Sequence, residues 1–402
     1  MQNKMTNLPQ GWEVKKLEEI ANIKGGKRLP KGENLLDNNT KFAYIRVADF
    51  QDNGTINLQN IKFINENTYN VLKNYKIYDD NLYISIAGTI GKSGIIPKEL
   101  NGAILTENAV KLEYIQNNIS NKFMYFFTLS NIFKTQIQTS TKIVAQPKLA
   151  ITRLKQIQIP LPPLKEQERI VGILDESFAK IDESIKILEQ NLLNLDELMQ
   201  SALQKAFNPL KDNAKENYKL PQSWEWKSLE EISENISAGG DKPKNCTESK
   251  TAKNQIPVYA NGVNNNGLVG YTDKATIIKP SLTISARETI GFVCIRKEPY
   301  FPIVRLISLI PCENILCLHY LYFCLNFFIA KGEGSSIPQL TIPKFKSLQI
   351  PLPPLKEQEQ IAKHLDFVFE KTKALKELYT KELKDYEELK QSLLNKAFKG
   401  EL

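Results

Sequence analysis

The 402-residue sequence has few cysteines, few histidines and no long apolar run. Its five cysteines are an odd number and include no CxxC pair, which disfavours both a disulfide framework and a zinc site. No apolar run approaches the ~18–20 residues of a membrane span, and the first residues lack the apolar core of a signal peptide. We therefore expect a cytoplasmic, globular protein with no membrane partner.

Motifs that carry catalysis are also missing. The segment Gly88–Ser93 (GTIGKS) resembles the end of a phosphate-binding loop, but Ile86 stands where that loop requires its first glycine. The two histidines form no HxH or HExxH motif, and there is no glycine-rich cofactor loop after a strand and no NPPY-like tetrapeptide for amino-methyl transfer. We expect no catalytic residue, no metal and no cofactor in this chain.

The sequence contains two copies of one pattern. Three segments of the first copy return in the second: 8–20 as 220–232, 159–168 as 350–359, and 197–207 as 388–398. The first pair, LPQGWEVKKLEEI and LPQSWEWKSLEEI, is identical at ten of thirteen positions, and the second, IPLPPLKEQE, is unchanged. The interiors between these landmarks, 24–158 and 237–349, match poorly. We infer that one scaffold presents two different surfaces.

A helical pattern follows each IPLPPL segment, because the proline run favours an extended approach and then a helix start. Apolar residues recur there in alternating steps of three and four, as in a coiled coil. The first seam comprises Val171, Leu174, Phe178, Ile181, Ile185, Leu188, Leu192, Leu195, Met199, Ala202 and Ala206. The second comprises Leu365, Val368, Thr372, Leu375, Tyr379, Tyr386, Leu389 and Leu393, interrupted by Glu382. We expect the helices to pair antiparallel; the alternative is that each packs only on its own domain.

Both interiors are expected to be mixed α/β domains. Short strands are predicted at 44–47, 82–86, 256–259 and 282–285, and aromatic-rich helices at 123–129 and 319–328. The predicted fold class is α+β, with two mixed α/β domains joined by two long antiparallel coiled-coil helices in a pseudo-two-fold repeat. The predicted boundaries are 1–158 and 208–349 for the domains, and 159–207 and 350–402 for the helices.

Positive charge is concentrated in the two interiors. Residues 24–158 carry 18 lysines and arginines against 10 acidic residues, and residues 237–349 carry 13 against 7. Basic domains on acidic or neutral helices suit a polyanion that is held at two places.

Candidate base-reading residues lie on loops rich in glycine, asparagine and lysine, because groove recognition needs polar or cationic side chains that can enter the groove. In the first interior they are Lys27, Arg28, Lys31, Asn34 and Arg46. In the second they are Lys242, Lys244, Asn261, Asn264, Asn265, Asn266 and Arg287. A plain turn is the alternative for the asparagine run, and a core salt bridge is the alternative for Arg46 and Arg287.

The duplicated IPLPPLKEQE, the LPQGWE and LPQSWE openings and the TIG segments at 89–91 and 289–291 resemble the specificity subunits of type I restriction–modification systems. The resemblance covers essentially the whole chain. It implies two target-recognition domains, each of which reads one half of a split, asymmetric site in double-stranded DNA.

The resemblance also implies partners. The helices would dock two methyltransferase subunits, and nuclease–translocase subunits would then join. S-adenosylmethionine, ATP and Mg would be bound by those subunits, not by this chain. Two alternatives remain: a recognition partner of a fused restriction–methylation enzyme, or a coiled-coil scaffold that binds no DNA.

Overall fold

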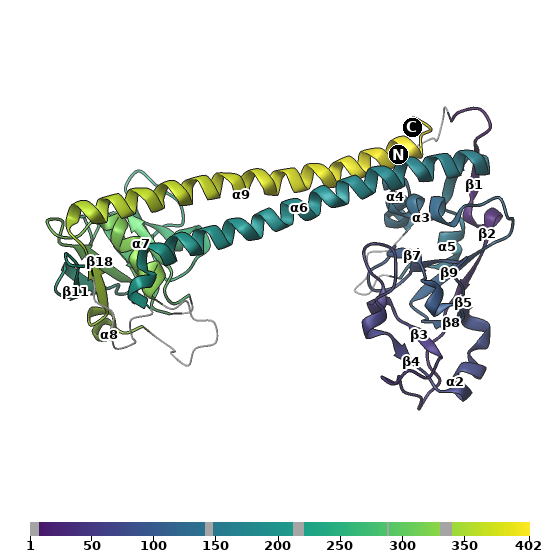
Figure 1. The fold of residues 1–402 in the computed structure, drawn as a ribbon, viewed down its shortest axis with the longest axis horizontal. Helices are drawn as coiled ribbons and strands as arrows, with labels where there is room; N and C mark the ends of the chain where they lie inside the picture. Colours follow the sequence, from purple (N-terminus) through teal and green to yellow (C-terminus); the bar gives the residue numbers. More distant parts are fainter. Residues whose placement is uncertain (1–7, 141–147, 212–220, 288, 330–339) are drawn as a thin grey trace. The chain divides into compact units, whose positions relative to one another are not determined.

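The computed structural model describes residues 8–140, 148–211, 221–287, 289–329 and 340–402. Contacts divide the chain into two compact units, residues 1–188 with 381–402 and residues 189–380. Each unit contains one sequence interior and parts of both long helices, α6 (Leu164–Lys211) and α9 (Leu355–Ala397) (Figure 1).

The first unit is built on two four-stranded sheets. Its strands are β1 (Glu13–Lys16), β2 (Ala21–Gly25), β3 (Ala43–Ile45), β4 (Lys62–Phe63), β5 (Lys76–Ile77), β6 (Leu82–Ser85), β7 (Ser93–Ile95), β8 (Ala103–Leu105), β9 (Ala109–Tyr114) and β10 (Gln158–Leu161). Its short helices are α1 (Leu17–Ile20), α2 (Glu66–Val71), α3 (Asn121–Leu129), α4 (Asn131–Ser140) and α5 (Ile151–Lys155). One sheet has the antiparallel order β2-β9-β6-β7, and the other has the order β4-β3-β8-β5 with β3 and β8 parallel.

The second unit repeats this plan. Its strands are β11 (Glu225–Ser228), β12 (Ser233–Ala238), β13 (Ile256–Tyr259), β14 (Leu268–Thr272), β15 (Ser281–Ile284), β16 (Val293–Arg296), β17 (Phe301–Pro302), β18 (Ile307–Pro311) and β19 (Gln349–Leu352). Its short helices are α7 (Leu318–Phe328) and α8 (Ile342–Lys346). The antiparallel sheet β12-β18-β15-β16 corresponds to β2-β9-β6-β7, and the parallel pair β13·β17 corresponds to β3·β8.

The predicted fold class and internal repeat are therefore confirmed. The four predicted strands occur as β3, β6, β13 and β15, and the two aromatic-rich helices occur as α3 and α7. The first strand is shorter than predicted, because Val47 begins a short 3₁₀ turn (Val47–Asp49) instead of continuing β3.

The repeated landmarks frame each unit by pairing with one another. Strand β1, from the LPQGWEVKKLEEI segment, pairs antiparallel with β10, from the IPLPP segment, and Glu13 lies opposite Leu161. Strand β11 pairs with β19 in the same register, with Glu225 opposite Leu352. These segments match between the copies because each supplies one side of the same two-stranded frame.

A buried glutamine anchors the start of α6. The side chain of Gln167 is 1% exposed, and its Oε1 accepts a hydrogen bond from the backbone N–H of Ser120 at 2.8 Å. Its Nε2 donates to the carbonyls of Asn118 at 3.1 Å and Pro162 at 2.9 Å. Because Ser120 is the N-cap residue of α3, this amide fastens the long helix to the aromatic-rich helix.

Gln358 does the same at the start of α9. It is fully buried, its Oε1 accepts from the backbone N–H of Cys317 at 2.9 Å, and Cys317 is the N-cap residue of α7. Its Nε2 donates to the carbonyls of Ile315 at 2.9 Å and Pro353 at 2.7 Å. The repeated glutamine of the KEQE segment is thus explained by one set of three hydrogen bonds, which is made in both units.

The third repeated segment buries a phenylalanine in the domain of the other copy. The ring of Phe398, just after α9, lies 5.1 Å from the ring of Phe123 on α3 in the first unit. The ring of Phe207, near the end of α6, lies 5.8 Å from that of Tyr320 on α7 in the second unit. Each unit therefore combines the interior of one copy with the helix end of the other, so neither helix packs only on its own domain.

Helices α6 and α9 run side by side and antiparallel (Figure 1). In the first unit, Arg169 donates to the carbonyl of Leu402 at 2.8 Å, while Asp182 pairs with Lys390 at 2.5 Å. Residue numbers thus rise along α6 as they fall along α9. The expected antiparallel coiled coil is confirmed.

The apolar seam follows the prediction on α6 more closely than on α9. On α6 the buried or half-buried residues include all those predicted: Val171, Leu174, Phe178, Ile181, Ile185, Leu188, Leu192, Leu195, Met199, Ala202 and Ala206. On α9, Leu365 and Thr372 are buried, and Val368, Tyr379, Tyr386 and Leu393 are half-buried.

Leu375 and Leu389 are corrections to the predicted seam, because they are 38% and 45% exposed. The next residue along the helix, Lys376 or Lys390, is the one turned toward α6. Lys376 pairs with Asp196 and Lys390 with Asp182, so a lysine stem and an ion pair stand where the leucine was expected.

Candidate nucleic-acid interface

A glycine loop after β2 carries the first group of candidate cations. The backbone N–H of Gly26 donates to the carbonyl of Ala109 at 3.0 Å, and a Cβ at Gly26 would lie 2.1 Å from the carbonyl oxygen of Thr106. Only glycine allows this approach. The loop therefore leaves the sheet pressed against the turn that joins β8 to β9, and it carries the next residues into solvent.

The candidate residues on this loop are all exposed: Lys27, Arg28, Lys31 and Asn34. Arg28 is 79% exposed at its side chain, and its Nε lies 2.7 Å from Oε1 of Glu107 on the turn. Burial acts to raise the pKa of Glu107, but hydrogen bonds from Arg28, from its own backbone and from Thr106 outweigh burial and lower that pKa. The guanidinium is thus held in place at the surface by an ionised carboxylate.

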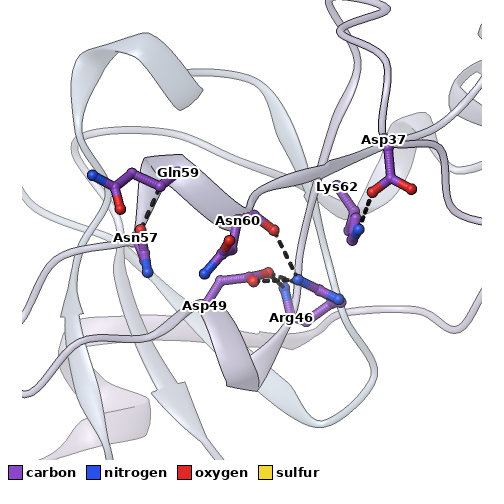
Figure 2. A network of polar contacts seen from close by, with 7 residues as sticks. All are labelled: Asp37, Arg46, Asp49, Asn57, Gln59, Asn60 and Lys62. Carbon is purple, nitrogen blue, oxygen red and sulfur yellow. Dashed lines mark hydrogen bonds and ion pairs between the residues drawn. The ribbon is translucent and has the colours of Figure 1, made fainter.

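Arg46 lies in a different environment, shown in Figure 2. Its Nη2 lies 2.5 Å from Oδ1 of Asp49, its Nε lies 3.0 Å from Oδ2, and Nη2 also donates to the carbonyl of Asn60 at 3.0 Å. The Asp49 side chain is 1% exposed. Of the two readings left open by the sequence, the structure favours the salt bridge, because the guanidinium is committed to a buried carboxylate and a carbonyl.

The second unit has the corresponding loop after β12. The backbone N–H of Gly239 donates to the carbonyl of Leu306 at 2.8 Å, and a Cβ there would lie 2.6 Å from the backbone N of Ile303. Gly239 thus corresponds to Gly26 in position, and a larger residue is excluded at both places because its Cβ would clash with the backbone of the neighbouring turn. The candidate cations Lys242 and Lys244 follow it and are exposed.

Asn261 has a structural role that the sequence did not reveal. Its Nδ2 donates to the carbonyl of Val304 at 2.6 Å, and its Oδ1 accepts from the backbone N–H of Ala286 at 2.8 Å. The side chain therefore ties together the loop after β15 and the turn after β17. Asn261 therefore positions two loops, and its part in base reading stays a prediction.

The asparagine run forms a turn, as the alternative reading held. Asn265 and Asn266 take positive φ values of 48° and 52°, followed by Gly267 at 79°. Asparagine tolerates this region better than other residues. The side chains of Asn264, Asn265 and Asn266 are exposed, whereas Arg287 is half-buried and has interactions of its own.

The sequence reasoning missed the turn between β17 and β18. Val304 and Arg305 have φ values of 53° and 60°, and the backbone N–H of Leu306 donates to the carbonyl of Ile303 at 3.1 Å. Two positive φ values at the centre of such a turn normally require residues such as Asn-Gly. Each left-handed non-glycine residue costs on the order of 1–2 kcal/mol. No turn signal in the sequence marks this place.

The second unit also contains a cavity of about 580 Å³ beside β16, lined by residues that include Cys294, Arg296, Tyr322, Asp366 and Lys373. Burial raises the pKa of the Cys294 thiol, so the neutral form is favoured over the nucleophilic thiolate. Within the described ranges, no three His, Cys, Asp or Glu side chains gather closely enough to hold a metal ion. No helix in the described part of the chain has the length and apolar character needed to cross a membrane.

A duplicated domain with exposed cations on matched loops, carried on a pair of long helices, defines a two-domain DNA-recognition protein. A family model described as the type I restriction modification DNA specificity domain matches residues 9–193 and 221–385. The chain belongs to this family, which confirms the prediction of a DNA specificity subunit of a type I restriction–modification system.

Curated relatives agree along most of the chain. A putative type I specificity subunit of Mycoplasma pneumoniae is 29% identical over 357 residues, covering 87% of this chain and 87% of the relative. A putative type I restriction enzyme specificity subunit of Methanocaldococcus jannaschii is 24% identical over 420 residues, covering 98% of this chain and 94% of the relative.

Solved structures show the same fold. A chain from a structural study of complex assembly and conformational transition of the type I R-M system has a TM-score of 0.80 and 20% identity, covering 98% of this chain and 100% of that chain. The HsdS subunit from Thermoanaerobacter tengcongensis has a TM-score of 0.63 and 21% identity, with both chains covered at 100%.

Proposed function

We propose that this chain reads a split, asymmetric site in double-stranded DNA, with one half of the site read by each repeat. In this proposal it is the non-catalytic member of an assembly in the cytoplasm. Two methyltransferase subunits dock on its helices, and nuclease–translocase subunits join them. S-adenosylmethionine, ATP and Mg belong to those partners.

The observation that carries this proposal is that matched loops display different side chains. Gly26 and Gly239 make the same close approach in the two units. Two residues later, the first unit presents Arg28 and the second presents Asp241, and both are exposed. Contacts with bases carry sequence information, whereas contacts with phosphates do not. Matched loops with different side chains at this position therefore predict two different half-sites.

Exposed apolar side chains on α9 support docking of protein subunits. Phe367, Leu378 and Leu389 are 59%, 56% and 45% exposed. They recur every eleven residues, which is close to three helical turns, so they share one face of the helix. Ile187 and Leu198 on α6 have the same spacing and are 55% and 51% exposed. Apolar stripes of this kind on exposed helices are typical of surfaces that bind other proteins.

The proposal is tested by sequencing the methylated bases of the host genome with and without this gene, and by electrophoretic shift of the assembled complex over a salt series. We expect one split motif to lose its methylation when the gene is deleted. Binding should weaken steeply with salt, because phosphate contacts release counterions. An unchanged methylation pattern together with no shift at low salt would instead identify a scaffold that binds no DNA. Co-purification with a single fused enzyme would identify the other alternative.

A further inference from the structure

The turn Ile303–Leu306 in the second unit is strained and exposed at once. Val304 is a β-branched residue with a φ of 53°, a conformation that such residues almost never adopt, and Arg305 follows at 60°. The side chain of Val304 is 49% exposed and that of Arg305 is also exposed. Neither side chain is buried in a core, so packing does not explain why these residues occupy the turn.

The surrounding structure holds this conformation from two sides. The backbone N–H groups of Val304 and Arg305 donate to the carbonyls of Gly240 and Gly239, both at 2.8 Å. On the other side, Asn261 donates to the carbonyl of Val304 at 2.6 Å. A strained backbone conformation that several neighbouring contacts hold in place is a feature of functional sites.

Arg305 is available to a ligand. The structure shows no ion pair or hydrogen bond for its guanidinium within the described residues. In contrast, Arg296 on the adjacent sheet lies 3.5 Å from the ring centroid of Tyr259 and donates from Nε to Thr283 at 3.0 Å. Of these two arginines, the exposed one on the turn is the one without a partner among the residues that the structure describes.

The first unit shows what occupies the corresponding place. The turn Thr106–Ala109 has the same closing hydrogen bond, at 3.2 Å, and Gly26 donates to Ala109 as Gly239 donates to Leu306, so Asn108 stands at the place of Arg305. There the acid, Glu107, is on the turn and the arginine, Arg28, is on the loop. In the second unit the acid, Asp241, is on the loop and the arginine is on the turn. Both units therefore present one exposed guanidinium where the glycine loop meets the turn.

We propose that Arg305 is a specificity-determining residue that contacts a base pair of the second half-site, and that the strained turn exists to position it. This inference rests on the proposed DNA-reading function. A guanidinium recognises guanine through two parallel hydrogen bonds to O6 and N7 in the major groove, so a G·C pair is the expected target.

The test uses the full chain assembled with its methyltransferase subunits, and duplexes selected from a pool in which the second half-site is randomised. For Arg305→Ala we expect the preference at one base pair to fall roughly 5- to 150-fold, while preferences at the other positions and in the first half-site persist. Lys297→Ala is the matched control. Lys297 is exposed and follows β16 at the end of the sheet β12-β18-β15-β16 that lies away from the turn Ile303–Leu306. Its substitution removes one exposed cation and should leave every preference unchanged.

A second variant separates folding from recognition. Val304→Asn with Arg305→Gly gives the turn the sequence that its φ values favour. We expect this double variant to have a higher melting temperature than the natural chain and yet to lose the same base preference. A loss of function in a more stable protein does not come from misfolding.

The remaining outcomes would overturn the assignment. Unchanged preferences in both variants would show that Arg305 does not read DNA. A uniform loss of affinity with unchanged preferences would make it a phosphate contact instead. If the natural assembly itself selects no sequence, the proposed function fails, and that result is distinct from failure of the variants alone.

Discussion

Lys390 on α9 lies 2.5 Å from Asp182 on α6, and Nζ of the same lysine lies 5.7 Å from the ring centroid of Phe178. A second lysine, Lys376, pairs with Asp196 in the other unit. The two pairs are fourteen residues apart on each helix, which is two heptads. Paired charges in this spacing fix the register of antiparallel helices.

Charge reversal tests this register. Lys390→Glu places a second carboxylate beside Asp182 and removes the cation over Phe178, so we expect the free energy of unfolding to fall by about 0.5–1.5 kcal/mol. The figure is small because Asp182 is 61% exposed at its side chain. Adding Asp182→Lys should restore part of the loss, and denaturant titration of the natural chain and the two variants measures it. No recovery in the double variant would mean that the ion pair does not contribute.

Gln358→Ala should be far more damaging than its size suggests. It removes three hydrogen bonds and leaves the backbone N–H of Cys317 and two carbonyls without their partner in a buried site. We expect a loss of about 2–4 kcal/mol in the free energy of unfolding. The matched control is Gln360→Ala, two residues further along α9 and exposed, which should change stability by less than about 0.5 kcal/mol. Equal effects of the two substitutions on stability would show that Gln358 does not anchor α9.

Two phenylalanines near α9 should separate stability from assembly. Phe398 is 1% exposed and packs on Phe123, so Phe398→Ala should cost about 3–5 kcal/mol in the first unit. Phe367 is 59% exposed, so Phe367→Ala should leave the melting temperature nearly unchanged but weaken co-purification of methyltransferase subunits. Undiminished co-purification would place the docking surface elsewhere.

The ion pair between Glu107 and Arg28 predicts a dependence on pH. The pKa of Glu107 is lower in the folded chain than its usual value of 4.5, so folding favours the ionised form. That contribution is present above the unfolded pKa and is lost as the pH falls through the lower folded pKa. The difference in unfolding free energy between the natural chain and Glu107→Gln should therefore be largest near neutral pH and shrink below about pH 4.5. The exposed Glu99→Gln is the control, and a constant difference would contradict the prediction.

The frame of the fold was predictable because its segments occur twice. Repetition identified the segments that contain β1, β10, β11 and β19 and the starts of both long helices, although the sequence did not predict that these segments form strands. Heptad spacing placed the α6 seam well, but it misplaced Leu375 and Leu389 on α9. Leucine at the right spacing outweighed a neighbouring lysine in the sequence pattern, whereas in the molecule the lysine forms an ion pair across the helices.

The candidate interface was only partly predictable, for a different reason. Consecutive glycines in the sequence indicate a loop, so the exposed positions of Arg28 and Lys242 could be predicted. Arg305 could not, because valine and arginine carry no turn signal and valine favours strands. Its role depends on contacts with Gly239 and Asn261, which are distant in sequence. Arg46 had two readings in the sequence, and only the position of Asp49 decides between them.

The anchoring glutamines have a consequence for how new specificities arise. Gln167 and Gln358 bind only main-chain groups: each binds one N–H and one carbonyl of the domain it holds, and one carbonyl of its own IPLPPL segment. At these glutamines an incoming domain therefore has to match a backbone shape and no particular side chain. The glutamine at the helix start can bind any recognition domain that presents its main-chain N–H and carbonyl groups in the same arrangement. Recombination at the two identical IPLPPLKEQE segments can then exchange a whole recognition domain in one step, while the hydrogen bonds of the glutamine are kept.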